Sequence, residues 1–379
     1  MQARRSRLPR DDIARRGRPA RSHPGRAESV EVQRPVRGVD VGVALTPIVE
    51  KQIVDLEAFR GRTIAVDGNL ELYQFLSVIR LRDGSPLKDG KGRITSHLSG
   101  LMFRTTRLIA DYDVRPIFVF DGTPPSLKAR EIEKRRAARE KAARDYELAL
   151  KGGDYGTAWS KAVMTSRLTR EMVSEAKTLL QLLGIPYVQA PSEGEAQASW
   201  LARQGVAWAV GSKDYDSLLF GAPRVARFLT ISGSEFLPSL GRSRPTQPEI
   251  IELDPWLHSL SITREQLIDV AILVGTDFNE GIKGIGPKKG VKLIREIGSL
   301  DNASEEIHRG LPENLQEIRE FFLHPPVEPN PSIVRSPTDE AAVFDFLVDE
   351  RGFTRERVRV ALERLRPPGF RSPTLDSYP

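Results

Sequence analysis

The chain has 379 residues, with 57 Lys and Arg, 51 Asp and Glu, five His and no cysteine. This length suits one large domain or two modest ones with a substantial core. The lack of cysteine excludes disulfides and thiolate zinc sites, and the scattered histidines show no metal-ligand spacing. No apolar run approaches the roughly 18 residues of a membrane span, and the N-terminus lacks the apolar core of a signal peptide. We therefore expect a cytoplasmic protein without a membrane span.

The net charge of +6 comes from the first 41 residues, which hold 11 Arg and five acidic residues. The rest of the chain is neutral overall, so any evidence for nucleic-acid binding must be local. Residues 1–41 are rich in Arg, Pro, Gly and Ser and have no apolar period, which predicts a disordered extension.

Apolar periodicity begins at Gly42 and continues nearly to the C-terminus. Short apolar runs and helical patterns alternate, which predicts an α/β fold with a parallel sheet covered by helices. The expected strands are 63–66, 116–120, 185–189 and 206–210, and the expected helices are Asn69–Ile79, Ser96–Tyr112 and Thr169–Leu183. After about residue 325 a Pro-rich stretch leads into a last pair of helical segments.

Seven acidic residues in five short motifs are the candidate functional residues. They are Asp67 in IAVDGN, Asp121 in IFVFDGTPP, Glu193 and Glu195 in APSEGEA, Asp214 and Asp216 in SKDYDSLLFG, and Asp277 in LVGTDFNEG. The first two follow apolar runs that read as buried parallel strands, so their carboxylates point into the crevice at the carboxyl edge of the sheet. Carboxylates gathered there raise one another's pKa unless they are neutralised, and Mg²⁺ with oxygen ligands neutralises them. The pattern therefore predicts a two-metal phosphodiesterase site.

Each acidic motif also has a purely structural explanation when taken alone. These are a helix cap at Asp67, a capping box over Ser192–Glu195, the first turn of a short helix at Asp214 and Asp216, and a turn at Asp277. Asp121-Gly122-Thr123 also resembles the motif of haloacid-dehalogenase phosphatases, but Val119 stands at the nucleophile position and cannot form an aspartyl-phosphate.

Two basic segments are candidates for contacts with phosphate. Lys128–Arg144 has eight basic and three acidic residues and almost no large apolar side chain. This composition predicts a helix, and its place after Asp121 favours phosphate contact over a plain solvated surface. In the string GIKGIGPKKGVKLI, Gly284 and Gly286 allow a tight turn before a helix, which predicts a helix–hairpin–helix contact with the DNA backbone. A simple Gly-rich turn is the alternative, and the lack of a Gly-Lys-Ser/Thr at the required spacing argues against a P-loop.

From Gly42 to about Ser377 the chain resembles an archaeal flap endonuclease, a structure-specific 5′ nuclease of the XPG group. The resemblance rests on strings such as IAVDGNLELYQFLS, GIPYVQAPSEGEAQAS and ILVGTDFNEGIKGIGPKKG. It implies a PIN-like nuclease core with a parallel-rich twisted sheet, a helical arch insertion and a helix–hairpin–helix element. The implied parts are a core at 42–262 with the arch at about 126–165, a helix–hairpin–helix and helical part at 263–345, and a C-terminal helix and tail at 346–379.

The resemblance also implies roles for single residues. The first of two Mg²⁺ ions, which Mn²⁺ can replace, is held by Asp67, Asp121, Glu193 and Glu195, and the second by Asp214, Asp216 and Asp277. Lys128 and Arg135 orient the scissile phosphate, and a base stacks on Tyr73, although the residues alone predict a core position for Tyr73. The DNA backbone is contacted by Lys283, Gly284, Gly286, Lys288 and Lys289.

The implied function is Mg²⁺-dependent cleavage of 5′ flaps in DNA replication and repair, with 5′–3′ exonuclease activity, by a monomer acting on branched DNA. A non-catalytic branched-DNA binding module and an RNA-directed PIN nuclease are the competing classes. The seven carboxylates argue against the first, and the helix–hairpin–helix element argues against the second.

Both ends of the chain depart from the family pattern. In the implied sliding-clamp (proliferating-cell nuclear antigen) motif, Leu375 and Tyr378 remain, but Ser372 and Pro379 replace a Gln and an aromatic residue, so we expect weak binding. Val41 stands where family members begin with Met. We therefore expect residues 1–40 to be dispensable, the product of a mis-assigned start, with a basic DNA-tethering arm as the alternative.

Overall fold

The computed structural model describes residues 43–366, apart from 82–83, 155, 158–160, 162–164, 232 and 238–241. The main sheet of this described part has seven strands in the order β1-β9-β6-β5-β2-β3-β4. They are β1 (Gln52–Ile53), β2 (Thr63–Asp67), β3 (Arg115–Phe120), β4 (Tyr187–Gln189), β5 (Ala209–Gly211), β6 (Arg224–Arg227) and β9 (Glu249–Glu252). The five strands from β6 to β4 are parallel, whereas β9 pairs antiparallel with β6 and with β1.

Helices connect the strands and continue beyond the sheet. The α-helices are α1 (Gly68–Val78), α2 (Ser96–Gly100), α3 (Thr106–Tyr112), α4 (Ala129–Lys151), α6 (Arg170–Leu182), α7 (Gly194–Arg203), α8 (Asp216–Leu219), α9 (Leu253–Leu260), α10 (Arg264–Val274), α11 (Pro287–Ile297), α12 (Glu305–His308), α13 (Leu315–Leu323), α14 (Glu340–Phe344) and α15 (Arg355–Leu365). Short 3₁₀ and π turns are Leu56–Phe59, Leu101–Thr105, Ser126–Lys128, Leu300–Asn302 and Asp345–Glu350. Two small hairpins pair β7 (Gly233–Leu237) with β8 (Arg242–Thr246) and β10 (Gly275–Thr276) with β11 (Asn279–Glu280).

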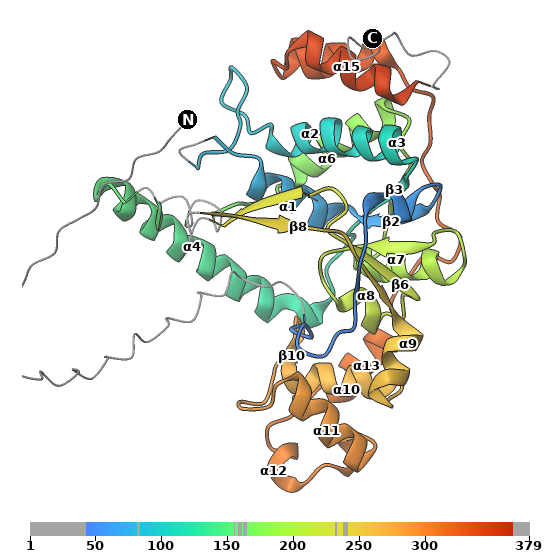
Figure 1. Cartoon of the computed structure of the whole chain (residues 1–379). Coiled ribbons are helices and arrows are strands. Elements are labelled where there is room, and N and C mark those ends of the chain that lie inside the picture. The colour runs from blue at the N-terminus through green and yellow to red at the C-terminus, as the bar shows by residue number, and fades with distance from the viewer. Residues whose placement is uncertain are drawn as a thin grey trace, which may run out of the picture. The chain divides into compact units, whose positions relative to one another are not determined.

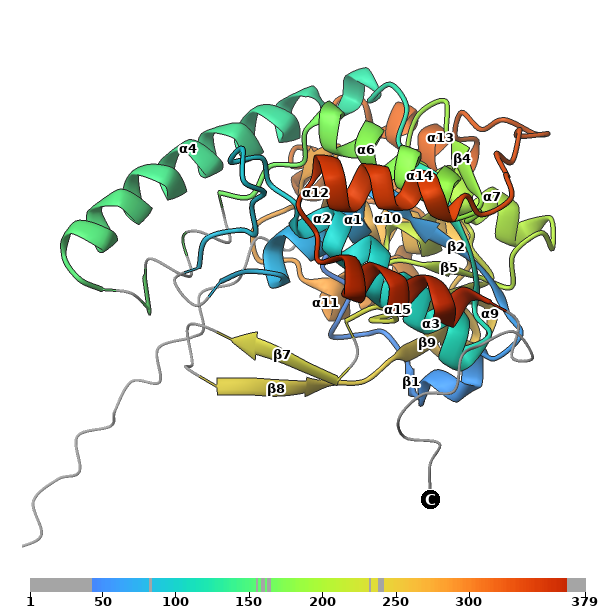
Figure 2. The same cartoon turned by 90° about the horizontal axis from the view of Figure 1, so that it is seen from above.

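Both faces of the sheet are covered because side chains alternate along each strand. On β2, Ala65 joins a core formed with α7, α9, α10 and α13, whereas Ile64 and Val66 join the opposite core with α1, α2, α6 and α15. Figures 1 and 2 show these two groups of helices on opposite faces of the sheet. The predicted α/β fold with a helix-covered parallel sheet is confirmed.

The predicted elements agree with the structure within a few residues. The strands expected at 63–66 and 116–120 are β2 and β3, whereas those expected at 185–189 and 206–210 are shorter or displaced. The helix expected at Ser96–Tyr112 is α2 and α3 joined by a π turn. Within the described residues, no helix is both long and apolar enough to span a membrane.

The expected basic helix is α4, which runs seven residues beyond Arg144. Its side chains are mostly exposed, and it extends away from the sheet in both views (Figures 1 and 2). A charged helix of this kind buries little apolar surface, so its sequence fits a role at the surface better than one in the core.

A tight loop follows α10 and leads to the expected Gly-rich turn. A Cβ at Gly281 would lie 2.1 Å from the carbonyl oxygen of Val274, so this close approach of two backbones requires glycine. The turn is closed by a hydrogen bond from the Ile285 N–H to the Ile282 carbonyl, and Gly284 has a φ of 88°. Helix α11 begins directly after Gly286, as predicted.

Candidate active site

Asp67 and Asp121 lie at the ends of two neighbouring parallel strands. Asp67 is the last residue of β2, and its side chain accepts the Leu70 N–H at 3.0 Å, so the predicted helix cap is confirmed. Asp121 follows β3, and its Oδ1 accepts the Gly194 N–H at 2.6 Å. A Cβ at Gly194 would lie 2.9 Å from this oxygen, so glycine lets the start of α7 approach Asp121. The motif that contains both glutamates is thereby anchored beside the strand ends.

Glu193 and Glu195 begin α7. The predicted capping box over Ser192–Glu195 is wrong: Glu193 is the N-cap residue and makes no side-chain cap bond. Both carboxylates instead form hydrogen bonds with side chains that are distant in the sequence. Glu193 Oε2 accepts a hydrogen bond from the Lys128 ammonium at 2.6 Å. Glu195 Oε1 accepts hydrogen bonds from the hydroxyl groups of Ser212 and Ser217.

Asp214 and Asp216 lie in the segment that follows β5. Asp216 is the first residue of α8, so the first-turn position predicted for it is confirmed. Its Oδ1 also accepts the N–H of Val43 at 3.0 Å, from a segment 173 residues away. The N–H of Asp214 donates to the Ser212 hydroxyl oxygen at 3.1 Å.

Asp277 lies in the loop between β10 and β11, shortly after the end of α10 at Val274. Its two oxygens face the two basic side chains that the sequence singled out. Arg135 donates to Oδ1 at 2.7 Å, and the Lys128 ammonium lies 3.2 Å from Oδ2. Arg135 is also paired with Glu131 one turn earlier on α4. The base of α4 is thus tied by ion pairs to the acidic cluster.

Burial and mutual repulsion raise the pKa of most of these carboxyl groups. The pKa values of Asp67, Asp214 and Asp216 lie well above the ordinary value, because of burial first and then of neighbouring carboxylates such as Glu195. Desolvation of the carboxyl group also raises the pKa of Asp121, whereas the Gly194 N–H and the Lys128 ammonium oppose that rise. These carboxyl groups therefore interact with one another as one electrostatic cluster.

The Lys128 and Arg135 side chains offset this negative charge at one end of the cluster. Burial alone would raise the pKa of Asp277, but the two cationic neighbours outweigh burial and lower it. The pKa of Glu193 remains raised by burial, although the Lys128 ammonium opposes that shift. The pKa of Lys128 is raised because its carboxylate partners outweigh the cost of burial.

The donor set fits a hard divalent cation. All seven candidate ligands are carboxylates, and the excess of buried negative charge is what such a cation would offset. Among the residues described, however, no group of three or more acidic or histidine side chains is arranged to hold an ion as it stands. Glu193 is paired with Lys128, and Asp277 is paired with both Lys128 and Arg135. A bound cation would therefore require some of these side chains to change partners.

The other predicted residues lie on α1 and around the start of α11. Tyr73 is half-buried on α1. Lys283, Lys288 and Lys289 are exposed around the turn before α11, and Lys289 donates to the Gly284 carbonyl at 3.1 Å. The predicted extension at residues 1–41, together with Leu375 and Tyr378, lies outside the described residues.

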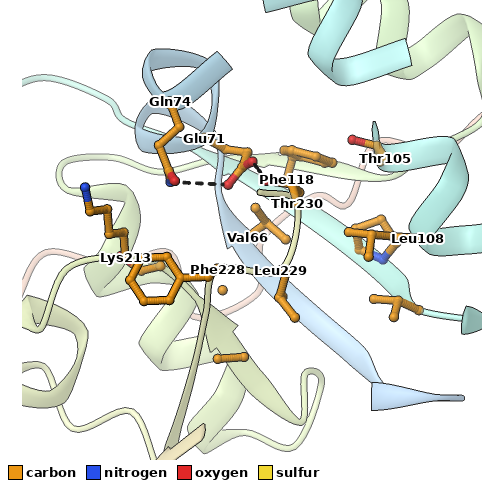
Figure 3. Close-up of a pocket in the computed structure, with 15 residues that line it drawn as sticks. Val66, Glu71, Gln74, Thr105, Leu108, Phe118, Lys213, Phe228, Leu229 and Thr230 are labelled. Atoms are coloured by element: carbon orange, nitrogen blue, oxygen red, sulfur yellow. Dashed lines mark hydrogen bonds between the residues drawn. The ribbon is translucent and has the colours of Figure 1, made fainter. Parts of the chain in front are cut away.

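Several residues of the site escaped sequence reasoning. Ser212 and Ser217 flank the acidic pair in the string SKDYDS. Their position beside the acidic residues was the sequence feature that could have identified them. Sequence reasoning also missed a buried acidic residue that does not belong to this group, Glu71, one turn into α1 after Asp67. It is buried and bonded to Thr230, and burial raises its pKa to about 7 (Figure 3).

Glu71 lines a small cavity between the sheet, α1 and α3. The cavity measures about 20 Å³, which is room for about one water molecule. Two polar atoms of its lining, Gln74 Oε1 and Thr105 Oγ1, have no hydrogen-bond partner in the described part of the chain. The space therefore suits a buried water molecule and not an organic ligand.

The sequence matches two family models, the XPG N-terminal domain over residues 42–142 and the XPG I-region over residues 184–277. Flap endonuclease 1 of Staphylothermus marinus is 48% identical over 331 residues, which are 86% of this chain and 94% of that protein. Flap endonuclease 1 of Pyrobaculum aerophilum is 50% identical over 337 residues, or 86% and 95% of the two chains.

Solved structures give the same result. Flap endonuclease-1 from Methanococcus jannaschii superposes with a TM-score of 0.68 at 43% identity, covering 86% of this chain and 98% of that one. The catalytic core of Rad2 in complex with DNA substrate has a TM-score of 0.63 at 24% identity, covers 85% and 98% of the two chains, and shares the fold. The resemblance to an archaeal flap endonuclease is confirmed, and so is the expected enzyme class. The chain therefore belongs to the flap endonuclease 1 family of structure-specific 5′ flap nucleases.

Proposed function

We propose that this protein removes 5′ flaps from branched DNA with the help of two Mg²⁺ ions held by the acidic cluster. The observation that carries the proposal is the convergence of carboxylates from five separate motifs beside Lys128 and Arg135. Phosphodiester hydrolysis needs charge stabilisation on both the attacking and the leaving oxygen, and two divalent ions supply it.

We assign the carboxylates to the ions by their place in the fold. Asp67, Asp121, Glu193 and Glu195 stand at the ends of β2 and β3 and at the start of α7, and would hold the first ion. Asp214, Asp216 and Asp277 come from the loops after β5 and α10, and would hold the second. Mn²⁺ prefers the same oxygen ligands and would replace Mg²⁺.

Lys128 and Arg135 would bind the scissile phosphate. Both side chains already lie against carboxylates of the cluster, so an arriving phosphate would exchange places with these acidic partners. Arg offers a planar pair of N–H donors to phosphate oxygens, and Lys offers a compact charge. Their positive charge would neutralise the charge that develops on the phosphate in the transition state.

The exposed turn before α11 would hold the duplex at a distance from the cut. Lys283, Lys288 and Lys289 surround it, and in the first turn of α11, after Pro287, the backbone N–H groups of Lys288 and Lys289 have no carbonyl partner within the helix. Such contacts position the duplex without reading its sequence. The partly exposed ring of Tyr73 would stack on a base near the cut.

Single-turnover cleavage of a double-flap DNA with Mg²⁺ tests the proposal. Asp121→Ala or Asp216→Ala should slow cleavage by at least about 100-fold and leave flap binding nearly unchanged, because charge stabilisation in such sites contributes several kcal/mol. Asp254→Ala, an exposed aspartate on α9, is the matched control and should cleave normally. Substantial cleavage by Asp216→Ala would refute the metal assignment. Faster cutting of a matched RNA flap than of the DNA would favour the RNA-directed alternative.

A further inference from the structure

Two serine hydroxyl groups meet on a single oxygen of Glu195. Ser212 Oγ donates to Glu195 Oε1 at 2.8 Å, and Ser217 Oγ donates to the same oxygen at 2.7 Å. The serines come from different elements, since Ser212 follows β5 and Ser217 lies in α8. They are 4% and 0% exposed, so water does not compete for these bonds. The two bonds therefore act on Glu195 from two fixed directions.

Ser212 also connects Glu195 to a second carboxylate residue. Its hydroxyl oxygen accepts the Asp214 N–H at 3.1 Å while its proton goes to Glu195. A serine hydroxyl has one proton and two lone pairs, so both bonds can exist together. The chain from the Asp214 backbone through Ser212 to Glu195 fixes the separation of two motifs that the proposed function assigns to different metal ions.

We propose that Ser212 and Ser217 are positioning residues that hold Glu195 with Oε1 occupied and Oε2 available to a divalent cation. The inference rests on the proposed function, because it takes Glu195 as a metal ligand. The terminal side-chain torsion of a glutamate has a broad distribution, and the neighbouring carboxylates repel the Glu195 carboxylate. An unrestrained Glu195 side chain would therefore turn away from the cluster. Hydrogen-bonding partners of metal ligands typically contribute about 10–100-fold to metal affinity.

The chain provides a closely matched control in Ser199. It is 0% exposed and belongs to the same network, but its hydroxyl bonds to backbone carbonyls, that of Glu195 at 2.7 Å and that of Ser217 at 3.2 Å, and not to the Glu195 carboxylate. Ser199→Ala thus removes an equally buried serine hydroxyl next to Glu195 and keeps both hydrogen bonds to the Glu195 carboxylate. Ser212→Thr keeps the hydroxyl and tests rescue.

The experiment is a titration of the full chain with Mn²⁺ by calorimetry, without DNA, with thermal unfolding of every variant as a check on folding. Ser212→Ala and Ser217→Ala should each weaken Mn²⁺ binding about 10-fold, and Ser199→Ala and Ser212→Thr should bind as the parent does. In flap cleavage, the Mg²⁺ concentration for half-maximal rate should rise in the two Ala variants, while the rate at saturating Mg²⁺ falls less. If Ser217→Ala does not fold, Ser212→Ala with Ser212→Thr decides the question.

Glu195→Gln separates this inference from the proposed function. If Glu195→Gln weakens Mn²⁺ binding but neither serine variant does, the positioning role is wrong and the metal role of Glu195 stands. Equal weakening by Ser199→Ala would also overturn the positioning role, because a general loss of packing would then explain it. If Glu195→Gln binds Mn²⁺ like the parent, the metal role of Glu195 fails and the inference fails with it.

Discussion

Replacing Lys128 with alanine tests whether basic side chains take the place of cations in the metal-free protein. The Lys128 ammonium lies 2.6 Å from Glu193 and 3.2 Å from Asp277, and the lysine side chain is 17% exposed. Lys128→Ala would leave two partly or fully buried carboxylates short of positive charge. Breaking a buried ion pair costs about 3–5 kcal/mol. Because Arg135 still faces Asp277, we expect the lower end, a loss of about 3 kcal/mol in the free energy of unfolding without metal.

The same variant should bind divalent metal more tightly and cleave more slowly. The ammonium no longer competes for the carboxylate oxygens, so a metal ion recovers part of the lost free energy. If it recovers about half, the gain of roughly 1.4 kcal/mol makes Mn²⁺ binding about 10-fold tighter. Cleavage should fall by about 100-fold, because the charge that would neutralise the phosphate is gone.

Chemical denaturation with EDTA and with Mn²⁺, Mn²⁺ calorimetry and single-turnover cleavage measure these three effects. Lys134→Ala is the control: its ammonium lies 3.5 Å from Glu280, and both side chains are largely exposed. An exposed pair contributes little, so this variant should match the parent in metal-free stability and in Mn²⁺ binding. Weaker Mn²⁺ binding by Lys128→Ala, or unchanged metal-free stability, would refute the reasoning.

Three further predictions concern other parts of the molecule. Because burial raises the pKa of Glu71 from 4.5 to about 7, its contribution to stability is full below pH 4.5 and is lost as the pH rises through 7. In urea unfolding, Glu71→Gln should have the same free energy of unfolding as the parent at pH 4 and a higher one at pH 8, by at most about 3.4 kcal/mol. Equal stability of the two proteins at both pH values would contradict this prediction. The double variant Lys288→Ala, Lys289→Ala should weaken DNA binding and reduce the slope of log affinity against log salt by about 2, and an unchanged slope would exclude these phosphate contacts. A truncation that removes Leu375 and Tyr378 should abolish only a weak, micromolar-class interaction with a sliding clamp, and loss of nanomolar binding would show that this segment was undervalued.

Local patterns in the sequence determined most secondary structure and the identity of the acidic motifs. The runs before Asp67 and Asp121 predicted β2 and β3, because a buried parallel strand is continuously apolar over a short length. The composition of Lys128–Arg144 predicted α4, since good helix formers without an apolar stripe suit an exposed helix. The break at the π turn Leu101–Thr105 was not predictable, because the apolar pattern continues through it.

The tertiary structure decided which partners the site residues have. The sequence predicted a local capping box at Ser192–Glu195, but Glu193 bonds to Lys128 and Glu195 to two serines. Sequence patterns report on neighbours within a few positions, whereas these contacts join segments up to 65 residues apart and arise from the order of strands in the sheet.

The charge state of the site likewise depends on the fold. By sequence, Asp216 and Asp277 are equivalent acidic residues after apolar segments. In the structure, burial among carboxylates raises the pKa of Asp216 well above its ordinary value, whereas Lys128 and Arg135 lower that of Asp277. The motifs determined which chemical groups are present. Only folding determined which charges lie within a few ångströms of one another, and electrostatic energy depends on that distance and on the exclusion of water.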